Sequence, residues 1–268
     1  MERLKGKVAI IIGAGQSPGE AMGIGRATTI SFLREGAAVL AVDRNAAAAR
    51  ESVEQGGENV DADVFEADVT DTPRLSAAVD AAMSRWGRID VLVYNVGVSV
   101  MGGEQLLDQI TDETFDRVNR INLRGAVMAA KFVEPIMRKQ GSGAIVSVSS
   151  ITAIETFTPL IAYRTSKAGL TAFTQYFAMR NAEYGIRANS ILPGLIETSM
   201  AVDTRMRLSG RTREDIVNER NSKVPLRKQG GSAWDVANAA VFLASDEAAF
   251  VTGVSLPVDG GALAKIGW

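Results

Sequence analysis

Short apolar runs rich in β-branched residues alternate with helical stretches along the whole chain, and this alternation constrains the fold more than any other feature. The runs expected to form strands are residues 7–12, 38–42, 60–66, 91–94, 144–148, 187–192 and 254–257. The stretches expected to form helices are residues 24–36, 73–86, 112–139, 162–184 and 233–244. Strands separated by helices throughout predict an α/β protein with one doubly wound parallel sheet.

The chain shows no linker, internal repeat or low-complexity tract, so we expect residues 1–268 to form a single domain. A chain of 268 residues is long enough for one large α/β domain with a substantial core. Residues 195–227 interrupt the alternation, because they are polar, rich in arginine and only weakly periodic.

A glycine-rich segment links the first predicted strand to the first predicted helix. The strand runs into Gly13 and Gly15, and after a polar interval the chain continues with Gly23, Ile24 and Gly25. Glycines let a backbone approach a pyrophosphate, and a helix N-terminus adds N–H groups and the positive end of its dipole. A lone glycine pattern can also be a tight turn. Its position between a strand and a helix predicts a dinucleotide site in a Rossmann-type domain.

The second predicted strand ends at Asp43. A carboxylate at that point can accept both hydroxyls of an adenosine ribose and would repel a 2′-phosphate. We therefore predict NAD as the coenzyme, while the neighbouring Arg44 leaves NADP open as an alternative.

The candidate catalytic stretch begins at Ser150, at the exit of a predicted strand, and continues to Tyr163 and Lys167 in a predicted helix. Tyr163 and Lys167 are four residues apart and thus lie on the same helix face. A nearby ammonium group can lower a phenol's pKa by roughly 1–3 units, which makes the phenol a usable proton carrier. The pair alone could equally be a surface lysine beside a half-buried tyrosine.

The chain contains no cysteine and no histidine. This absence excludes thiol nucleophiles, disulfides, Ser-His-Asp hydrolysis and any metal site built from His or Cys, so no metal is predicted. The net charge of −2 argues against a nucleic-acid partner. No apolar run is long enough to span a membrane, and the first residues lack a signal-peptide pattern, so we expect a cytoplasmic protein.

Taken together, the motifs resemble the short-chain dehydrogenase/reductase family over essentially the whole chain. The matching residues are the N-terminal glycines, Asp68, Asn95, Gly97, Asn122, Ser150, Tyr163, Lys167, Pro193, Gly194, Thr198, Asp259, Gly260 and Gly261. Ser150 stands thirteen residues before Tyr163 (163 − 150), a separation familiar in that family.

The resemblance implies a role for each matching residue. Tyr163 would be the general acid or base, Ser150 would orient the substrate oxygen, and Lys167 would hold the nicotinamide ribose and lower the pKa of the tyrosine. Asn122 would anchor a water chain that relays protons from Lys167. The residues expected at the coenzyme are Gly13, Gly15, Gly23, Ile24, Gly25, Asp43, Arg44, Asp68, Val69, Asn95, Gly97, Tyr163, Lys167, Pro193, Gly194, Ile196 and Thr198.

Three features depart from the family pattern. Gly13 and Gly23 are ten positions apart (23 − 13), which makes the glycine loop longer than usual. We expect the extra residues to bulge over the phosphates or the adenosine ribose, where Glu20 would further repel a 2′-phosphate. Ile12 replaces the threonine that usually precedes the first glycine. The usual Asn-Asn-Ala-Gly motif reads Tyr94-Asn95-Val96-Gly97 in this chain.

The prediction is an NAD(H)-dependent oxidoreductase that interconverts a secondary alcohol and a ketone. An NADP(H)-dependent ketone reductase is the first alternative. A lyase on the same scaffold, such as a halohydrin dehalogenase, and a non-catalytic NAD-binding module are the others. The intact glycines and Asp43 argue against the lyase, and the complete Asn-Ser-Tyr-Lys set argues against the non-catalytic module.

Family analogy places the substrate among residues 98–101, Ile151, Thr152, Glu155 and a variable loop at about 195–227. That lining is mostly apolar and favours a hydrophobic or cyclic substrate. Four arginines of the loop would either meet an anionic group or form a solvated face: Arg205, Arg207, Arg211 and Arg213. Family members are usually tetramers, so we expect helices 112–139 and 162–184 to pair across two-fold axes in a homotetramer.

Overall fold

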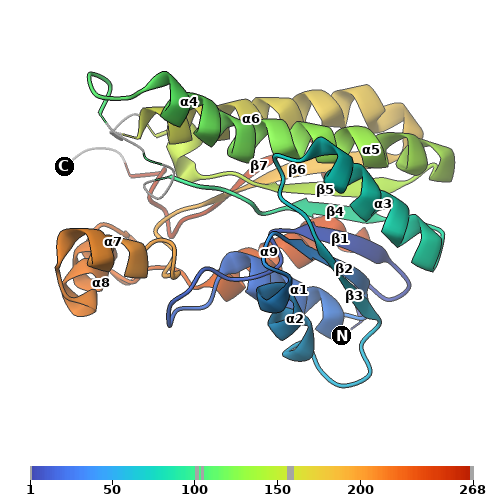
Figure 1. Cartoon of the computed structure of the whole chain (residues 1–268), viewed down its shortest axis with the longest axis horizontal. Helices are drawn as coiled ribbons and strands as arrows, with labels where there is room; N and C mark the ends of the chain where they lie inside the picture. Colours follow the sequence, from blue (N-terminus) through green and yellow to red (C-terminus); the bar gives the residue numbers. More distant parts are fainter. Residues whose placement is uncertain (1, 100–102, 104–105, 156–159, 266–268) are drawn as a thin grey trace.

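The computed structural model describes residues 2–99, 103, 106–155 and 160–265 (Figure 1). These residues form one parallel sheet of seven strands in the order β3-β2-β1-β4-β5-β6-β7. The strands are β1 (Val8–Ile12), β2 (Ala38–Asp43), β3 (Ala62–Glu66), β4 (Val91–Tyr94), β5 (Gly143–Val148), β6 (Ile186–Pro193) and β7 (Ser255–Val258). The predicted doubly wound parallel sheet is therefore confirmed.

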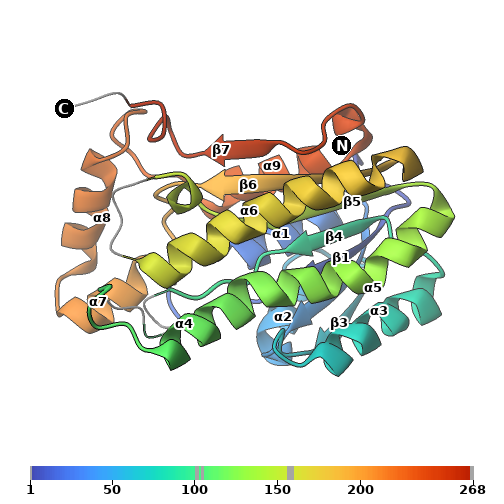
Figure 2. The ribbon, with the colours of Figure 1, turned by 90° about the horizontal axis from the view of Figure 1, so that it is seen from above.

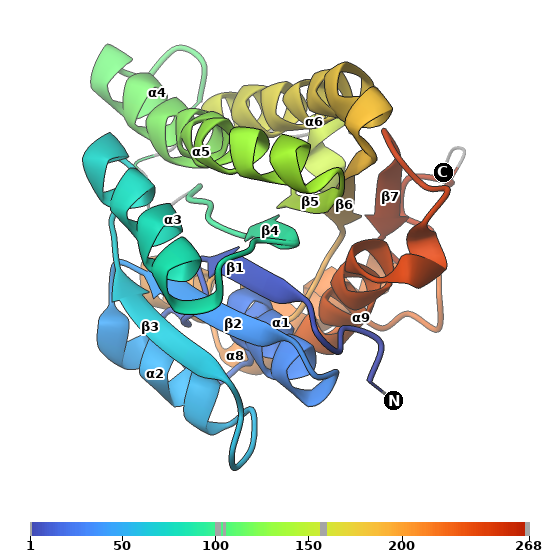
Figure 3. The ribbon, with the colours of Figure 1, turned by 90° about the vertical axis from the view of Figure 1, so that its right-hand side faces the viewer.

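Helices cover both faces of the sheet (Figure 3). The helices on one face are α3 (Thr72–Trp86), α4 (Asp112–Asn119), α5 (Gly125–Gln140) and α6 (Ile161–Asn181). Those on the other face are α1 (Ile24–Arg34), α2 (Ala46–Glu54) and α9 (Ala233–Ala244). Strand β1 shows why its run is apolar throughout. Ile10 and Ile12 pack into the core on one face, while Ala9 and Ile11 pack into the core on the other.

The order of the strands fixes where a ligand can bind. β1 pairs with β2 on one side and with β4 on the other, so the chain leaves the two central strands in opposite directions. Open parallel sheets bind ligands at the carboxyl ends of the strands around such a switch point. Helices α7 (Asp203–Ser209) and α8 (Arg213–Ser222) lie at that end of the sheet, to which the arrows of β6 and β7 point in Figure 2.

Several boundaries differ from the sequence expectation. Helix α2 was not expected; it begins after Asn45, whose side chain accepts the N–H of Ala48 at its N-terminus. β3 begins at Ala62 rather than at residue 60. The 195–227 segment also contains the two short helices α7 and α8, whose sparse apolar residues gave no clear helical period.

The long helix expected at residues 112–139 is present, but a π-helical turn (Arg120–Arg124) separates α4 from α5. Such turns rotate a helix face locally and often occur at functional sites. Here the turn contains Asn122, which is buried. None of the helices in the described ranges combines the length and the apolar character needed to cross a bilayer.

Candidate active site

The candidate catalytic side chains meet at the carboxyl ends of β4 and β5. Ser150 follows β5 and caps a short 3-10 turn (Ile151–Ala153), where its hydroxyl accepts the N–H of Thr152 at 3.2 Å. Tyr163 and Lys167 lie one turn apart in the first half of α6. A hydrogen bond joins the hydroxyls of Tyr163 and Ser150. The structure thus brings together the three residues that the sequence places up to seventeen positions apart (167 − 150).

The side-chain amine of Lys167 lies close to the ring of Tyr163. Its Nζ is 5.8 Å from the centre of the Tyr163 ring and donates to the carbonyl of Val148 at 2.8 Å. A second contact, at 3.5 Å, reaches the carbonyl of Val96. Two of the three N–H groups of Lys167 are thus directed at main-chain carbonyls, and the side chain is held in place.

Burial controls the charges of this group. It lowers the pKa of Lys167 to about 7, since removing an ammonium group from water disfavours its charged form. Burial also raises the pKa of Tyr163, and the Ser150 hydrogen bond and the charge of Arg205 act in the opposite direction. The lowering of the Tyr163 pKa by Lys167 that the family resemblance implies remains a prediction.

Asn122 is fully buried in the π-helical turn. Its side-chain oxygen accepts the N–H of Val98 at 2.8 Å, and its amide nitrogen donates to the Val98 carbonyl at 2.9 Å and to the hydroxyl of Ser166 at 3.0 Å. These bonds clamp the chain after β4 against α6. A proton relay through Asn122 remains a prediction.

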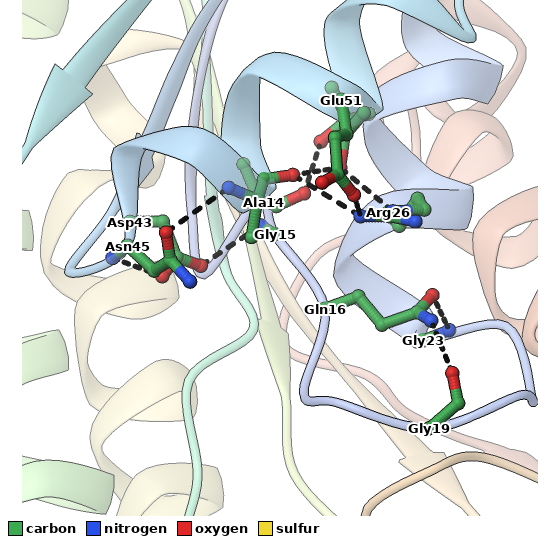
Figure 4. A network of polar contacts seen from close by, with 12 residues as sticks. Ala14, Gly15, Gln16, Gly19, Gly23, Arg26, Asp43, Asn45 and Glu51 are labelled. Atoms are coloured by element: carbon green, nitrogen blue, oxygen red, sulfur yellow. Dashed lines mark hydrogen bonds and ion pairs between the residues drawn. The ribbon is translucent and has the colours of Figure 1, made fainter.

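Asp43 lies beside Gly15, at the start of the glycine loop, and beside Asn45 (Figure 4). One oxygen of this carboxylate accepts the N–H of Gly15, and the other accepts the N–H of Asn45, each at 2.9 Å. Arg26 lies nearby but forms an ion pair of 2.6 Å with Glu51. The carboxylate is therefore fixed at the end of β2, where it retains free lone pairs for further donors.

Close packing explains the glycines at the start of α1. Gly13 has a φ of +82°, and a Cβ atom on Gly25 would collide with the Gly13 carbonyl. The amide of Asn95 donates to that same carbonyl at 3.0 Å and ties the glycine turn to the end of β4. No side chain fits at these points, so close packing of the turn against the protein requires glycine at both. Ile24 is the first residue of α1.

Further predicted coenzyme residues line the same edge. Asp68 accepts the N–H and the hydroxyl of Thr70 at 2.8 and 2.7 Å. Burial by itself would raise the pKa of Asp68. These bonds and the charge of Arg44 outweigh burial and keep that pKa below its usual value. Val69 is buried beside it. A Cβ atom on Gly97 would lie 3.0 Å from Lys167 Nζ, so this glycine leaves open the space beside the amine.

The chain after β6 closes the edge on its far side. Gly194 donates to the Val258 carbonyl at 3.0 Å, and a Cβ atom on Gly194 would lie 2.7 Å from the Cα of Asp259. Pro193 ends β6, and Ile196 forms an isolated bridge with Gly231. Thr198 is buried and its hydroxyl accepts the N–H of Ala201 at 3.3 Å. Together with the catalytic group, these residues line the edge of the sheet at the carboxyl ends of its strands.

The residues present fit a nicotinamide dinucleotide. Asp43 supplies acceptors for ribose hydroxyls, the Gly13–Gly25 contact leaves bare backbone before a helix N-terminus, and Gly97 leaves space beside the Lys167 amine. These are the donor and acceptor types that a ribose, a pyrophosphate and a second ribose require.

The extra residues of the glycine loop, which the sequence analysis expected over the phosphates or the adenosine ribose, contact another part of the chain. Residues 16–23 turn away from Asp43 (Figure 4) and contact the 195–227 segment instead. The N–H of Glu20 donates to Asp203 at 3.1 Å, and the hydroxyl of Ser199 donates to the Ala21 carbonyl at 2.6 Å. These contacts fix the main chain of the loop, and repulsion of a 2′-phosphate by Glu20 remains a prediction.

Sequence reasoning missed Asp203 and Ser199, which are 4% and 1% exposed. Asp203 also forms an ion pair of 2.5 Å with Arg213. No local pattern indicated the contacts of Asp203 with Glu20 and of Ser199 with Ala21, which join positions 183 and 178 residues apart. Val100 and Met101 of the expected substrate pocket lie outside the described residues.

A parallel sheet with a glycine turn after β1, an acidic end of β2 and a Ser-Tyr-Lys group at its carboxyl edge defines a dinucleotide-binding oxidoreductase. A family model described as enoyl-(acyl carrier protein) reductase matches residues 19–262. The chain is 37% identical over 260 residues to the 3-oxoacyl-(acyl-carrier-protein) reductase FabG of Thermotoga maritima, covering 97% of this chain and 98% of the relative.

Solved structures agree with this assignment. A putative short-chain dehydrogenase/reductase from Burkholderia xenovorans superposes with a TM-score of 0.91 at 37% identity, over 100% of both chains. A carveol dehydrogenase from Mycobacterium avium in complex with NAD superposes with a TM-score of 0.90 at 30% identity, over 99% of this chain and 100% of that one. The protein belongs to the short-chain dehydrogenase/reductase family, as the sequence predicted.

Proposed function

We propose that this protein is an NAD(H)-dependent oxidoreductase that interconverts a secondary alcohol and a ketone. One observation carries the proposal: the Tyr163 hydroxyl is hydrogen-bonded to Ser150, one helical turn before the amine of Lys167. A polar oxygen placed against this pair meets one hydroxyl that can donate a proton and another that can fix its orientation.

The coenzyme and the three catalytic residues each have a separate role in the proposed reaction. A bound nicotinamide coenzyme supplies the hydride-transfer chemistry. Tyr163 exchanges the proton with the substrate oxygen, and Ser150 holds that oxygen in place. Lys167 stays fixed by the Val148 carbonyl, and Gly97 places no side chain beside its amine. Ketone reduction starts from the neutral phenol, which burial favours, because burial raises the pKa of Tyr163.

NAD is the proposed coenzyme. Support comes from Asp43, whose carboxylate is held at the end of β2 by Gly15 and Asn45. A fixed negative charge there would repel a 2′-phosphate. Arg26 is paired with Glu51 and is thus engaged elsewhere. Exposed Arg44 is the residue that supports the alternative, NADP.

We propose that the protein assembles as a homotetramer. Tyr176 and Met179 on α6 are 61% and 63% exposed, and Phe115 on α4 is 40% exposed. Apolar side chains on these neighbouring helices would be covered if copies paired across a two-fold axis. Mass photometry tests this assembly, and a monomer at micromolar concentration would contradict it. The cytoplasmic location and a small-molecule substrate, without nucleic acid or membrane, remain predictions.

Coenzyme consumption tests the proposed reaction. The purified protein is mixed with NADH or NADPH and a panel of ketones, and the loss of the reduced nicotinamide absorbance is recorded. The reverse reaction uses NAD⁺ and the matching alcohols. We expect turnover with NADH. Turnover only with NADPH would reverse the coenzyme assignment. Dinucleotide binding without any turnover would favour the non-catalytic module, and halide release without a coenzyme would favour the dehalogenase.

A further inference from the structure

Four of the six arginines in the 195–227 segment divide into two groups with different partners. Arg211 forms an ion pair with Glu219 at 2.6 Å, and Arg213 forms ion pairs with Asp203 and Glu197, each at 2.5 Å. These side chains are neutralised within the segment. They account for two of the four arginines for which the sequence left an anion-binding role open.

Arg205 and Arg220 form the other group. Arg205 in α7 donates to the main-chain carbonyl of Ala201 at 2.6 Å, and Arg220 in α8 donates to that of Ile196 at 3.0 Å. Within the described ranges, neither guanidinium forms an ion pair with a carboxylate. Both side chains are half-buried. Each is therefore held by neutral carbonyls, with several N–H donors left over.

The two guanidinium groups are close enough for their charges to interact, and the charge of Arg205 also reaches Tyr163. The main-chain carbonyls that hold them, of Ile196 and Ala201, flank the buried Thr198. Burial lowers the pKa of Arg220 to about 10, and the charge of Arg205 contributes in the same direction. The carboxylates of Glu197 and Glu219 offset part of this charge from a distance, but both are paired directly with Arg213 and Arg211 instead. Two half-buried like charges without a direct partner cost free energy, which a bound anion would recover.

We propose that Arg205 and Arg220 form a subsite for an anionic group of the substrate, with the reacting oxygen of the same molecule at Tyr163. The substrate class is then a ketone or secondary alcohol that also carries a carboxylate, or a sulfonate or phosphate of the same charge. Guanidinium groups bind such groups through paired N–H donors. This proposal rests on the proposed function, and it replaces the expectation of a wholly apolar substrate.

The phosphate groups of the coenzyme are also anionic and are the other candidate ligand for Arg205 and Arg220. A subsite for the coenzyme would change NADH affinity when the arginines are replaced. A subsite for the substrate would leave NADH affinity unchanged and would alter only the discrimination between charged and neutral substrates.

The test compares Arg205→Met and Arg220→Met with Arg207→Met. Arg207 lies in the same helix as Arg205 but is exposed, and it donates only to the Thr204 hydroxyl at 3.3 Å. Ketones carrying a terminal carboxylate are paired with their methyl esters, and kcat/KM is measured for each. The wild type should favour the acids by about tenfold or more, the first two variants should lose that preference, and Arg207→Met should keep it.

A binding measurement separates this proposal from the reaction itself. Calorimetry of the NAD⁺ complex with a 2-oxo carboxylate, and with its ester as the control, measures binding without turnover, because NAD⁺ carries no hydride to transfer to the ketone. Carboxylate binding that is lost in Arg205→Met supports the subsite even if no ketone is reduced. Equal affinity for acid and ester in the wild type overturns it. Weaker NADH binding in Arg205→Met or Arg220→Met, with the acid preference unchanged, assigns the pair to the coenzyme and also overturns it.

Discussion

The main-chain N–H of Glu20 donates a hydrogen bond to the carboxylate of Asp203 at 3.1 Å. This contact joins the long glycine loop before α1 to the start of α7 in the 195–227 segment. A Cβ atom on Gly19 would collide with the same carboxylate, so the loop backbone packs directly against the Asp203 side chain there. The extra residues of the loop thus serve as a bridge between the proposed coenzyme and substrate sides of the site.

Replacing Asp203 with alanine tests this bridge. The change removes the acceptor of the Glu20 N–H and one of the two ion-pair partners of Arg213. We expect a loss of about 1–3 kcal/mol in the free energy of unfolding, because Asp203 is buried and its partners lose their acceptor. NADH affinity should fall as well, since the loop loses its anchor. Chemical denaturation and fluorescence titration measure the two effects.

Glu214→Gln is the control for Asp203→Ala. Glu214 lies in the first turn of α8 and is exposed. An unchanged denaturation midpoint together with unchanged NADH affinity in Asp203→Ala would show that the bridge has no energetic role.

Asp43→Ala should shift the coenzyme preference. The substitution removes the carboxylate fixed by Gly15 and Asn45 and the negative charge at the end of β2. We expect NADH affinity to fall by roughly 10- to 100-fold, the equivalent of losing a hydrogen bond to a charged group, while NADPH affinity should rise. Arg44→Ala serves as the comparison and should leave NADH affinity nearly unchanged. Unaltered discrimination in Asp43→Ala would remove the basis for assigning NAD.

Asn122→Ala should destabilise the fold more than Asn119→Ala. Asn122 is fully buried and clamps Val98 with two hydrogen bonds, whereas Asn119 is only half-buried and donates to Phe115 in its own helix. We expect a loss of about 1–3 kcal/mol for Asn122→Ala and less than about 0.5 kcal/mol for the control. Equal denaturation midpoints for the two variants would contradict the clamp.

Lys167 should make the stability of the coenzyme-free protein depend on pH. Burial lowers its pKa from 10.5 to about 7, so between these values the unfolded chain binds a proton that the folded protein lacks. The free energy of unfolding then rises with pH across this window, and below about pH 7 the full cost of burying the ammonium group is felt. Calorimetry should show a steeper rise from about pH 7 to about pH 9 for the wild type than for Lys167→Met. Parallel profiles would contradict the neutral lysine.

The sequence was a good guide to features written in local patterns. The strand at residues 91–94, the glycine turn at Gly13 and the pairing of Tyr163 with Lys167 follow from apolar runs and from helical spacing. Short-range patterns could not show how residues 16–23 reach Asp203, because that contact joins distant parts of the chain. Nor could they separate the paired Arg213 from the unpaired Arg205, since the difference depends on which carboxylates the fold brings close.

The π-helical turn around Asn122 was also beyond sequence reasoning. Its residues have ordinary helical propensity, and the turn arises from how the helix packs. Tyr94 donates to the Ile121 carbonyl at 2.5 Å, and a Cβ atom on Gly125 would collide with the Tyr94 hydroxyl. The hydroxyl of Tyr94 in β4 therefore forms a hydrogen bond with a main-chain carbonyl of the helix. This contact explains why the helical register changes there.

The rate of substrate reduction by Tyr163→Phe, measured beside its NADH affinity, tests the central claim most directly. The variant removes one oxygen atom and the hydrogen bond to Ser150 while keeping the ring beside Lys167. If Tyr163 carries the proton, NADH affinity should stay within about twofold, and kcat should fall by roughly 10²- to 10⁴-fold. A fall in kcat of less than about tenfold, equivalent to roughly 1.4 kcal/mol, would show that another group moves the proton.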